Sequence, residues 1–312
     1  MHADETTCQV LREKGRTAEQ TSYMWLYTTG SDALTPIVLY DYQPSCKGSC
    51  AQNFPEGFRG LVQCDGYQGY NKLEDVILVC CLAHARRKFF EAVPAARRKR
   101  LKLLDINSDE AIEDISLPDE EEAKQLLPAE IGLLYCNKLF YLERTLKDLN
   151  PEERKQQRDV LEQPVWDQFW NWLDTLHPTG GSKLGKAVNY AQNHHDTLMN
   201  YLLDGRCEIS INRAERKAKS YAIGRKAFLF HTSETGAGAS AVMYSIVETA
   251  KANNLNIFQY LYTVLLYMPD YMNSSAGIEQ LMPWSEFIKE QCSGLIDVES
   301  NVPEKRIPLP HR

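Results

Sequence analysis

The order of two kinds of segment along the chain constrains its fold more than any other feature. Before residue 84, five short runs rich in β-branched and aromatic residues are separated by Gly, Pro, Ser and Asp, and this composition predicts strands joined by turns. The runs span residues 2–11, 21–29, 36–43, 60–67 and 76–83, and the stretch YTTGSD at 27–32 predicts a hairpin. Between residues 119 and 204 no run has the composition of a strand. We therefore predict an α+β fold in which a helical segment follows the strands.

Apolar residues recur at helical spacing through the middle of the chain. One set is Leu133, Leu134, Leu139, Leu142 and Leu146, and a second is Trp166, Phe169, Trp170 and Leu173. We interpret the aromatic set as core rather than as a platform for stacking bases. Further along, we expect one helix over 186–205, an extended strand and turn over 222–233, and closing helices over 238–255 and 257–268.

The composition is that of a globular protein, with 43% hydrophobic and 25% charged residues. Nine cysteines follow no regular framework, and the first 15 residues contain no apolar leader. The longest apolar stretch, 257–269, is too short to cross a bilayer and contains Gln259. We therefore expect reduced thiols, a cytoplasmic location and no membrane partner.

Charge is distributed unevenly, which matters more than the formal net charge of −7. Residues 84–102 hold eight Lys or Arg and one Glu, whereas residues 105–122 hold nine acidic residues and no basic one. From Asn212 to Lys226 there are six Lys or Arg and one acid, Glu215. These runs fit either solvated helix faces and a charged linker or a surface that binds phosphates. The acidic run 105–122 either screens DNA binding or is disordered, and the sequence leaves this open.

Three carboxylates stand out by position although they lie far apart in sequence. Asp4 lies in the first predicted strand, Asp65 ends the fourth before Gly66, and Glu215 opens the late basic helix. Carboxylates at the carboxyl edge of a sheet could together hold one or two hard cations such as magnesium. Each also has a structural explanation, because Asp4 could end a strand and Asp65 could form a turn. Glu215 could complete a capping box with Asn212.

Eight motifs in order resemble the catalytic domain of insertion sequence 66 family transposases. They run from residue 2 to about residue 285 and are HADETTCQVL, MWLYTTG, YDYQPS, CDGYQGYN, CLAHARRKFFEA, NRAERKAKSYAIGRKAFLF, ASAVMYSIVETAKANNLNIFQYL and LMPWS. The resemblance implies an RNase H-like fold, with a mixed central sheet flanked by helices. It also implies two-metal DNA cleavage and strand transfer with Asp4, Asp65 and Glu215 as the Mg²⁺ or Mn²⁺ ligands.

The resemblance also implies a division of the chain and a set of partners. Residues 1–85 and 206–270 would form the two parts of the core. Residues 86–205 would form a mainly helical insertion with an acidic linker between the second Asp and the Glu, and 271–312 a C-terminal extension. The expected partners are insertion-sequence ends and target DNA, a second copy of the chain, and accessory transposition proteins.

A Cys-x-x-His step at Cys81 and His84 follows the second Asp, and His84 is therefore a candidate active-site or phosphate contact. A buried structural histidine is the alternative, and a zinc site formed by Cys46, Cys50, Cys81 and His84 is another. The neighbouring pair His194 and His195 is expected at the surface, since adjacent helical residues do not face one ligand. The expected phosphate contacts are Arg86, Arg87, Lys88, Arg213, Arg216, Arg225 and Lys226.

Three departures from the family pattern bear on activity. Ser210-Ile211-Asn212 stands where an Asp-Asn-Asn step is usual, and Leu82 stands where a Trp is usual. Met1 lies only three residues before Asp4, whereas family members carry a long N-terminal region expected to recognise element ends. We therefore expect an N-terminally truncated transposase. A catalytically silent DNA-binding or oligomerising remnant, or an RNase H-like nuclease acting on another substrate, are the alternatives.

Overall fold

The structure is a computed structural model that describes residues 1–45, 57–99, 115–271 and 276–293. The chain forms two compact units, one of Met1–Asp4 and Lys47–Glu215 and one of Glu5–Cys46 and Arg216–Arg312. Cys46, Cys50, residues 105–114 of the acidic run and the tail from 294 lie outside the described residues. Within the described ranges, no helix combines the length and the apolar character needed to cross a membrane.

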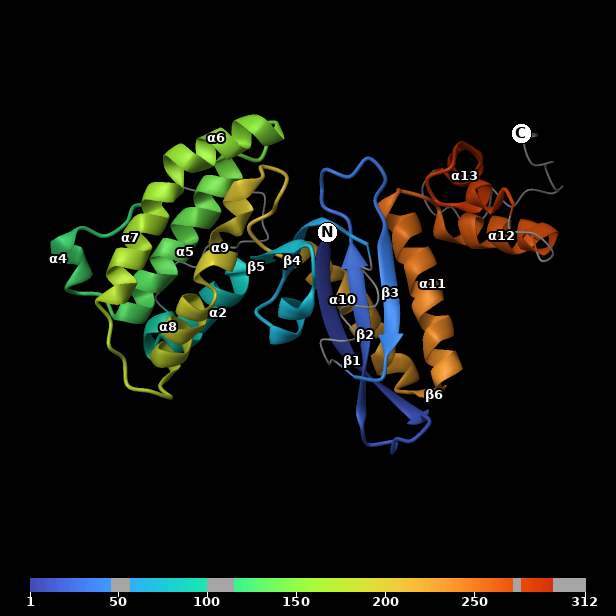
Figure 1. The fold of residues 1–312 in the computed structure, drawn as a ribbon, viewed down its shortest axis with the longest axis horizontal. Helices are drawn as coiled ribbons and strands as arrows, with labels where there is room; N and C mark the ends of the chain where they lie inside the picture. Colours follow the sequence, from blue (N-terminus) through green and yellow to red (C-terminus); the bar gives the residue numbers. More distant parts are fainter. Residues whose placement is uncertain (46–56, 100–114, 272–275, 294–312) are drawn as a thin grey trace. The chain divides into compact units, whose positions relative to one another are not determined.

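All five predicted strands are present and belong to one open mixed sheet. Its strands are β1 (His2–Arg12), β2 (Thr21–Thr28), β3 (Val38–Gln43), β4 (Gly60–Cys64) and β5 (Val76–Cys80). Their order is β3-β2-β1-β4-β5, and a short β6 (His231–Ser233) pairs with the far end of β1. β4 is parallel to both β1 and β5, whereas β2 and β3 form the predicted antiparallel hairpin. The protein is therefore a mixed α+β fold with helices beside its sheet (Figure 1).

The first unit contains the helical segment that follows β5. After η1 (Gln68–Lys72) and β5, α2 (Leu82–Ala92) and the short α3 (Ala95–Arg98) lead to the described helices that follow residue 114. These are α4 (Glu120–Ala123), α5 (Pro128–Thr145), α6 (Pro151–Leu161), α7 (Gln163–Asp174), α8 (Lys183–Asn193), α9 (His195–Met199) and η2 (Asn200–Leu203). As expected, the described residues between 119 and 204 contain no strand.

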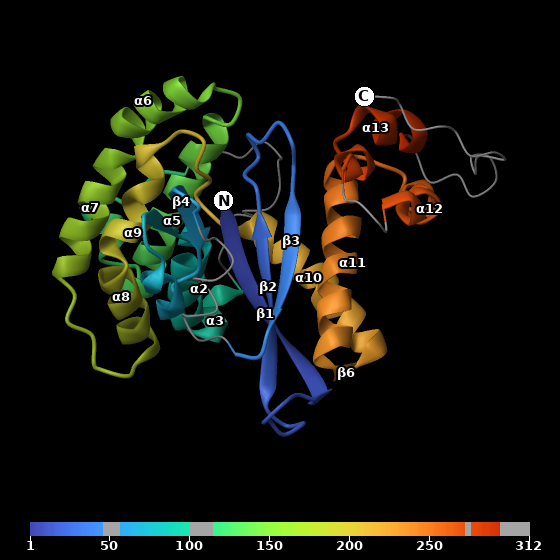
Figure 2. The ribbon, with the colours of Figure 1, turned by 45° about the vertical axis from the view of Figure 1, so that its right-hand side comes forward.

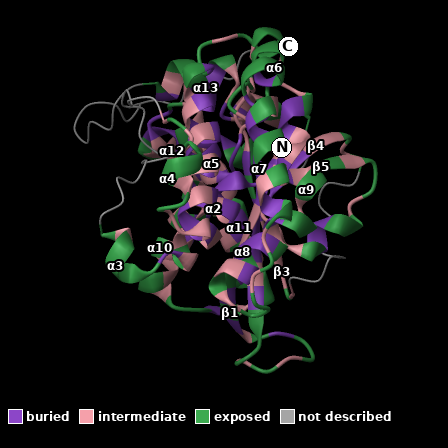
Figure 3. Cartoon of the chain, turned by 90° about the vertical axis from the view of Figure 1, so that its left-hand side faces the viewer, coloured by how far each residue is buried: buried purple, intermediate pink, exposed green. Residues whose placement is uncertain are grey.

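The aromatic set on α7 is the core of this helical block, as predicted. Trp166, Phe169 and Leu173 are almost completely buried, and Phe169 packs edge-on against Phe89 of α2 with ring centroids 6.0 Å apart. The burial-coloured view shows buried and exposed positions alternating along these helices (Figure 3). This pattern is typical of helices that pack one face against neighbours and leave the other to solvent.

Arg158 on α6 is a fully buried charge with every donor occupied. Its Nε and Nη2 donate to the two carboxylate oxygens of Glu143 at 2.6 and 2.9 Å. The remaining three N–H groups donate to the carbonyl oxygens of Tyr201, Asp204 and Cys207 at 2.7–2.9 Å. A guanidinium has five N–H donors, so this arginine ties α5, α6 and the loop after η2 together without an unpaired group.

The second unit contains the hairpin, most of β1 and the last helices. They are α10 (Asn212–Phe228), α11 (Glu234–Ala252), α12 (Ile257–Tyr267), η3 (Met268–Tyr271), η4 (Ile278–Leu281) and α13 (Glu286–Cys292). Tyr221 of α10 is fully buried, and its hydroxyl hydrogen-bonds His231 Nε2 at 2.8 Å. The Tyr221 ring also packs against Tyr40 and Tyr244, which links the helix to β3 and α11.

Helix α11 runs along the outer edge of β3, as two views of the chain show (Figures 1 and 2). Ser245, Thr249 and Asn253, spaced four residues apart, hydrogen-bond the strand's backbone. The N–H groups of Val38 and Tyr40 donate to Thr249 Oγ1 and Ser245 Oγ at 3.0 and 2.7 Å. Thr249 Oγ1 donates to the Val38 carbonyl and Asn253 Nδ2 to the Pro36 carbonyl, both at 2.8 Å. Side chains thus replace the strand that would otherwise pair with this edge.

Two local predictions are wrong. The stretch 222–233 is not extended, because α10 continues to Phe228 and only His231–Ser233 forms a strand. The single helix expected over 186–205 is interrupted at His194, whose backbone leaves the helical region at φ −117° and ψ 22°. α8 ends before that residue and α9 begins after it.

Candidate active site

The parallel pairing of β1 with β4 bears on the positions of the first two carboxylates. His2 pairs with Gln63, and the Gln63 N–H donates to the Met1 carbonyl at 2.8 Å. Continued two residues further, past the end of β4 at Cys64, the same register would align Asp4 with Asp65. Cys64 pairs with Cys80, so the next step aligns Asp65 with Cys81. Aligned residues of parallel strands point to the same face, and we infer that Asp4, Asp65 and Cys81 share one face near the ends of β4 and β5.

Glu215 reaches this region from the first turn of α10. Its N–H donates to the Ile211 carbonyl at 3.0 Å, so Ile211, not Asn212, accepts the first helical hydrogen bond. The Ile211 side chain is fully buried, and its N–H donates to Cys81 Sγ at 3.4 Å. The Glu215 side chain faces the His84 imidazole and the Arg87 guanidinium instead of the helix terminus. The capping box with Asn212 that the sequence allowed is therefore not the arrangement found.

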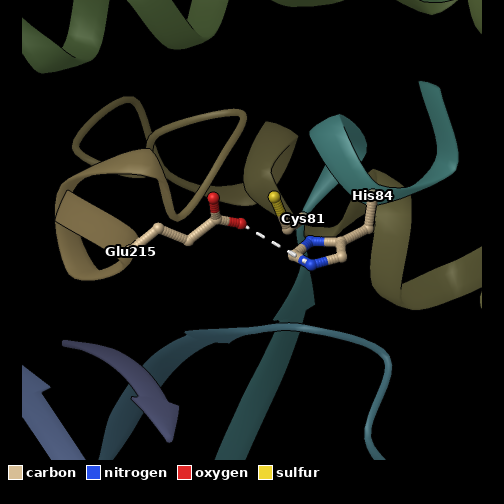
Figure 4. A group of neighbouring side chains, drawn as sticks. All are labelled: Cys81, His84 and Glu215. Atoms are coloured by element: carbon tan, nitrogen blue, oxygen red, sulfur yellow. Dashed lines mark ion pairs between the residues drawn. The ribbon is translucent and has the colours of Figure 1, made fainter. Parts of the chain in front are cut away.

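Cys81, His84 and Glu215 form a compact group of three possible ligands (Figure 4). One ligand atom from each lies within 4.8 Å of the other two. His84 Nε2 lies 3.6 Å from Glu215 Oε1, and Arg87 Nη2 lies 3.7 Å from Glu215 Oε2. These separations are too long for hydrogen bonds. Within the described part of the chain, Glu215 Oε1 and His84 Nδ1 are buried and have no hydrogen-bond partner.

Burial dominates the electrostatics of this group. Burial lowers the pKa of His84 from its ordinary value, opposed by the negative charges of Glu215 and Asp65 and reinforced by Arg87 and Lys88. Burial also raises the pKa of the Cys81 thiol to about 12, so without a metal this group is a neutral thiol.

The turn at Asp65 is held from both sides. Asp65 Oδ1 accepts the Tyr67 N–H at 2.8 Å, which stabilises the turn that follows β4. On the other side, a Cβ atom added to Gly66 would lie 2.6 Å from His194 Nε2 and 2.7 Å from a ring carbon of Tyr190. The glycine therefore allows α8 and the residue after it to approach the Asp65 turn closely.

His194 and Tyr190 are site neighbours that the sequence analysis missed. The two rings pack together with centroids 4.6 Å apart, and the Tyr190 hydroxyl lies 3.3 Å from Cys80 Sγ. Burial lowers the pKa of His194, while Asp65 raises it. The expectation that both histidines are at the surface is therefore wrong for His194. It holds for His195, which is half exposed and pairs with Asp196 at 2.7 Å. The helix break between the two residues gave no sequence signal.

The basic residues of α2 and of the start of α10 differ in what their charges contact. Arg86 Nε donates to Asn137 Oδ1 at 2.7 Å, and Arg213 Nε lies 3.2 Å from Glu208 Oε1. The Lys88 ammonium sits over the Tyr190 ring, 4.7 Å from its centroid. Arg87 is 54% exposed beside Glu215. Arg87 is thus the charge of α2 that both faces the site and reaches solvent.

The basic residues further along α10 belong to the second unit. Arg216 and Lys226 are exposed. Arg225 Nη1 donates to Thr7 Oγ1 at 2.7 Å, so its guanidinium is anchored beside β1. Their proposed role as phosphate contacts stays a prediction.

Family comparison agrees with the resemblance seen in the sequence. A model described as "Transposase IS66 family" matches residues 1–239, and one described as "IS66 C-terminal element" matches residues 245–284. The chain belongs to the IS66 transposase family. The site described above, from Asp4 to Glu215, lies within the first match. No solved structure matches this transposase chain.

Similar curated proteins come from Sinorhizobium fredii and are described as uncharacterized. The protein y4hP is 27% identical over 295 residues, which is 91% of this chain and 50% of that protein. The protein y4qI is 26% identical over 300 residues, again 91% of this chain and 50% of the relative. The protein y4jD is 28% identical over 261 residues, or 80% of this chain and 46% of the relative. This IS66 family chain thus spans about half the length of the relatives it matches.

Proposed function

We propose that this chain is the catalytic part of an insertion-sequence transposase that cleaves and joins DNA with two metal ions. The observation that carries the proposal is the unpaired buried oxygen of Glu215, because a buried carboxylate oxygen without a donor indicates a missing partner. The family match and the register that would align Asp4 with Asp65 support the same assignment. The proposed fold is RNase H-like, with residues 1–85 and 206–270 as its core, 86–205 as a helical insertion and 271–312 as an extension.

The donor set suits a hard divalent cation. Asp4, Asp65 and Glu215 would hold Mg²⁺ or Mn²⁺, since both prefer carboxylate oxygens. When bound, such ions activate the attacking hydroxyl and stabilise the leaving oxygen at a phosphodiester. Asp4 and Asp65 are not members of the three-residue group around His84, so their joint ligation with Glu215 is part of the proposal.

The chain's own residues would position the DNA and the carboxylates. β1 and the end of β4 would present Asp4 and Asp65, and α10 presents Glu215 from its first turn. Arg87, exposed beside Glu215, would contact a phosphate oxygen near the cleaved bond. His84 would orient Glu215 or contact the phosphate. Arg86, Lys88, Arg213, Arg216, Arg225 and Lys226 would contribute the sequence-independent part of DNA binding.

The second candidate is a silent remnant that binds DNA or oligomerises but does not cleave. Its support is the Ser210-Ile211-Asn212 step just before Glu215, which departs from the Asp-Asn-Asn step usual in the family. Whichever of the two candidates holds, self-assembly of the chain and its binding to accessory transposition proteins remain part of the transposase proposal.

Calorimetric titration with Mn²⁺ and nicking of supercoiled plasmid DNA test the proposal together. The parent should bind Mn²⁺ and nick DNA, whereas Asp65→Asn and Glu215→Gln should lose both. Glu152→Gln and Asp196→Asn, which neutralise exposed acids outside the site, serve as controls and should behave as the parent. DNA binding without Mn²⁺ binding or nicking would support the remnant. Preferential cleavage of RNA–DNA hybrids would support a nuclease of another substrate class.

A further inference from the structure

We propose that Cys81, His84 and Glu215 form a site for a softer divalent cation, such as Zn²⁺, that is distinct from the all-carboxylate site for Mg²⁺. The binding itself does not depend on the proposed function. The consequence of zinc binding for DNA cleavage does rest on the proposed function, because the two sites would share Glu215.

The distances between the three ligand atoms support the site. Zinc bonds of about 2.0–2.3 Å in a tetrahedron separate neighbouring ligand atoms by about 3.3–3.6 Å. His84 Nε2 and Glu215 Oε1 are already 3.6 Å apart. All three ligand atoms lie within 4.8 Å of one another, so the ligand atoms need to move by only about 1 Å to reach tetrahedral zinc geometry. The cysteine sulfur, imidazole ring and carboxylate converge on one point (Figure 4).

The backbone holds two of these side chains in fixed relation. The His84 N–H donates to the Cys81 carbonyl at 3.2 Å, and the Leu82 N–H donates to the Ile209 carbonyl at 3.1 Å. The second bond ties the start of α2 to the segment that leads into α10 and Glu215. The hydrogen bond from Ile211 to Cys81 likewise joins residues that lie 130 positions apart in the sequence. Two distant sequence segments therefore meet at the site. Such a preformed arrangement lowers the ordering cost of binding.

The ligand atoms are available to a metal ion. Glu215 Oε1 is buried and has no hydrogen-bond partner among the described residues, and His84 Nε2, the ring nitrogen that faces it, lies 3.6 Å away, beyond hydrogen-bond distance. Cys81 Sγ accepts one bond, from the Ile211 N–H at 3.4 Å, and amide donors to sulfur are compatible with metal thiolates. Three protein ligands leave the fourth tetrahedral position for water.

Donor chemistry selects the kind of ion. Thiolate and imidazole favour Zn²⁺ and Co²⁺, whereas Mg²⁺ takes oxygen ligands and has little affinity for sulfur. A cation bound through Cys81 would draw Glu215 toward His84 and away from a carboxylate site. Zinc would then compete with Mg²⁺ for one side chain and inhibit DNA cleavage.

Cobalt absorption tests the binding directly on the full chain. Metal-free parent protein titrated with Co²⁺ should gain thiolate-to-cobalt charge-transfer absorption and tetrahedral d–d bands at one equivalent. Cys81→Ser should lose the charge-transfer band. Cys81→Ser, His84→Ala and Glu215→Gln should each weaken Zn²⁺ binding by at least about 10–100-fold, since even outer-shell changes cost that much.

Control variants separate this site from other thiols. Cys136→Ala removes a buried thiol on α5, and the double variant Cys46→Ser with Cys50→Ser tests the other zinc set that the sequence allowed. Both should keep the cobalt spectrum of the parent. Loss of the band in the double variant would overturn the proposal, as would an unchanged band in folded Cys81→Ser. A parent that gives no thiolate band would overturn it without any variant.

Nicking assays distinguish this inference from the proposed function. Zinc should lower the Mg²⁺-dependent nicking rate of the parent, and the ratio of rates with and without zinc should approach one in Cys81→Ser. A thiolate band in a chain that never nicks DNA would leave the zinc site standing and contradict the transposase proposal. A parent that nicks DNA but shows neither the thiolate band nor zinc inhibition would support the transposase proposal and contradict the zinc site.

Discussion

Two groups of ionisable side chains in the first unit are built in opposite ways. Around Arg158, five donors meet five acceptors at 2.6–2.9 Å. Around the partly exposed Glu215, the nitrogens of His84 and Arg87 stay at 3.6 and 3.7 Å and a buried oxygen has no donor among the described residues. A folded chain usually satisfies the polar groups it buries. The Arg158 guanidinium, with all of its donors used, is therefore structural, whereas the Glu215 carboxylate leaves bonding capacity that a ligand could complete. Glu162 Oε1 near Arg158 is also buried without a partner among the described residues, so the contrast concerns Arg158 itself and not every polar atom around it.

The largest effect should come from breaking the satisfied group. Arg158→Met leaves the Glu143 carboxylate and three carbonyls buried without partners, and should lower the free energy of unfolding by about 3–5 kcal/mol. Urea denaturation followed by circular dichroism measures the change. Arg206→Met, which breaks the partly exposed pair with Asp204, should cost about 1 kcal/mol or less. Equal costs for the two variants would contradict the comparison.

A smaller effect should come from crowding the Asp65 turn. Gly66→Ala places a methyl group against His194 and Tyr190, and should lower the free energy of unfolding by about 1–3 kcal/mol. It should also weaken Mn²⁺ binding, because Asp65 moves with the turn. Gly180→Ala is the matched control, since a Cβ there meets nothing within 4 Å. If both variants bind Mn²⁺ as the parent does, the insertion does not position Asp65.

Glu162 offers a test of charge within the structural group. Burial and the nearby Glu143 carboxylate raise its pKa well above the ordinary value. Between the unfolded and folded pKa values the folded state holds the extra proton, so the free energy of unfolding falls as pH rises through that window. Glu162→Gln should remove this loss and stabilise the protein at pH 8, by less than Arg158→Met destabilises it. At pH 4 the gain should shrink. A gain independent of pH would contradict a neutral Glu162.

The smallest change in stability should come from the unsatisfied group. Glu215→Gln changes long contacts to the partly exposed His84 and Arg87 side chains, and should alter the free energy of unfolding by about 0.5 kcal/mol or less. Denaturation of the metal-free protein checks this, alongside the loss of Mn²⁺ binding. A cost as large as that of Arg158→Met would make Glu215 a structural residue.

Much of the fold follows from local sequence, and the exceptions have physical causes. The five strands and the buried face of α7 were predicted because their patterns repeat over several residues. The end of α10 was not, because residues 222–233 were expected to form an extended strand and turn. In the structure a Cβ atom added at Gly224 would collide with the Tyr244 hydroxyl, so close packing accounts for the glycine and the helix continues.

The candidate site likewise contains residues that the sequence pointed to and residues that it did not. Asp4, Asp65 and Glu215 stand out only weakly by position, were expected as one site from the family resemblance, and stay a prediction. The Cys81, His84 and Glu215 group depends on how α10 meets α2, a contact between distant segments that residue spacing does not encode. His194 was missed because its direction depends on a one-residue break between α8 and α9.

The hydrogen bonds from α11 to β3 have a consequence for how copies of this chain can associate. Open strand edges are where proteins most readily join by adding one backbone to another. Here Ser245 and Thr249 already bond backbone groups of Val38 and Tyr40, and Asn253 bonds the Pro36 carbonyl just before the strand. Assembly along this part of β3 must therefore rely on side-chain complementarity instead of backbone templating. The safeguard against fibrous self-association rests on three small polar residues of one helix.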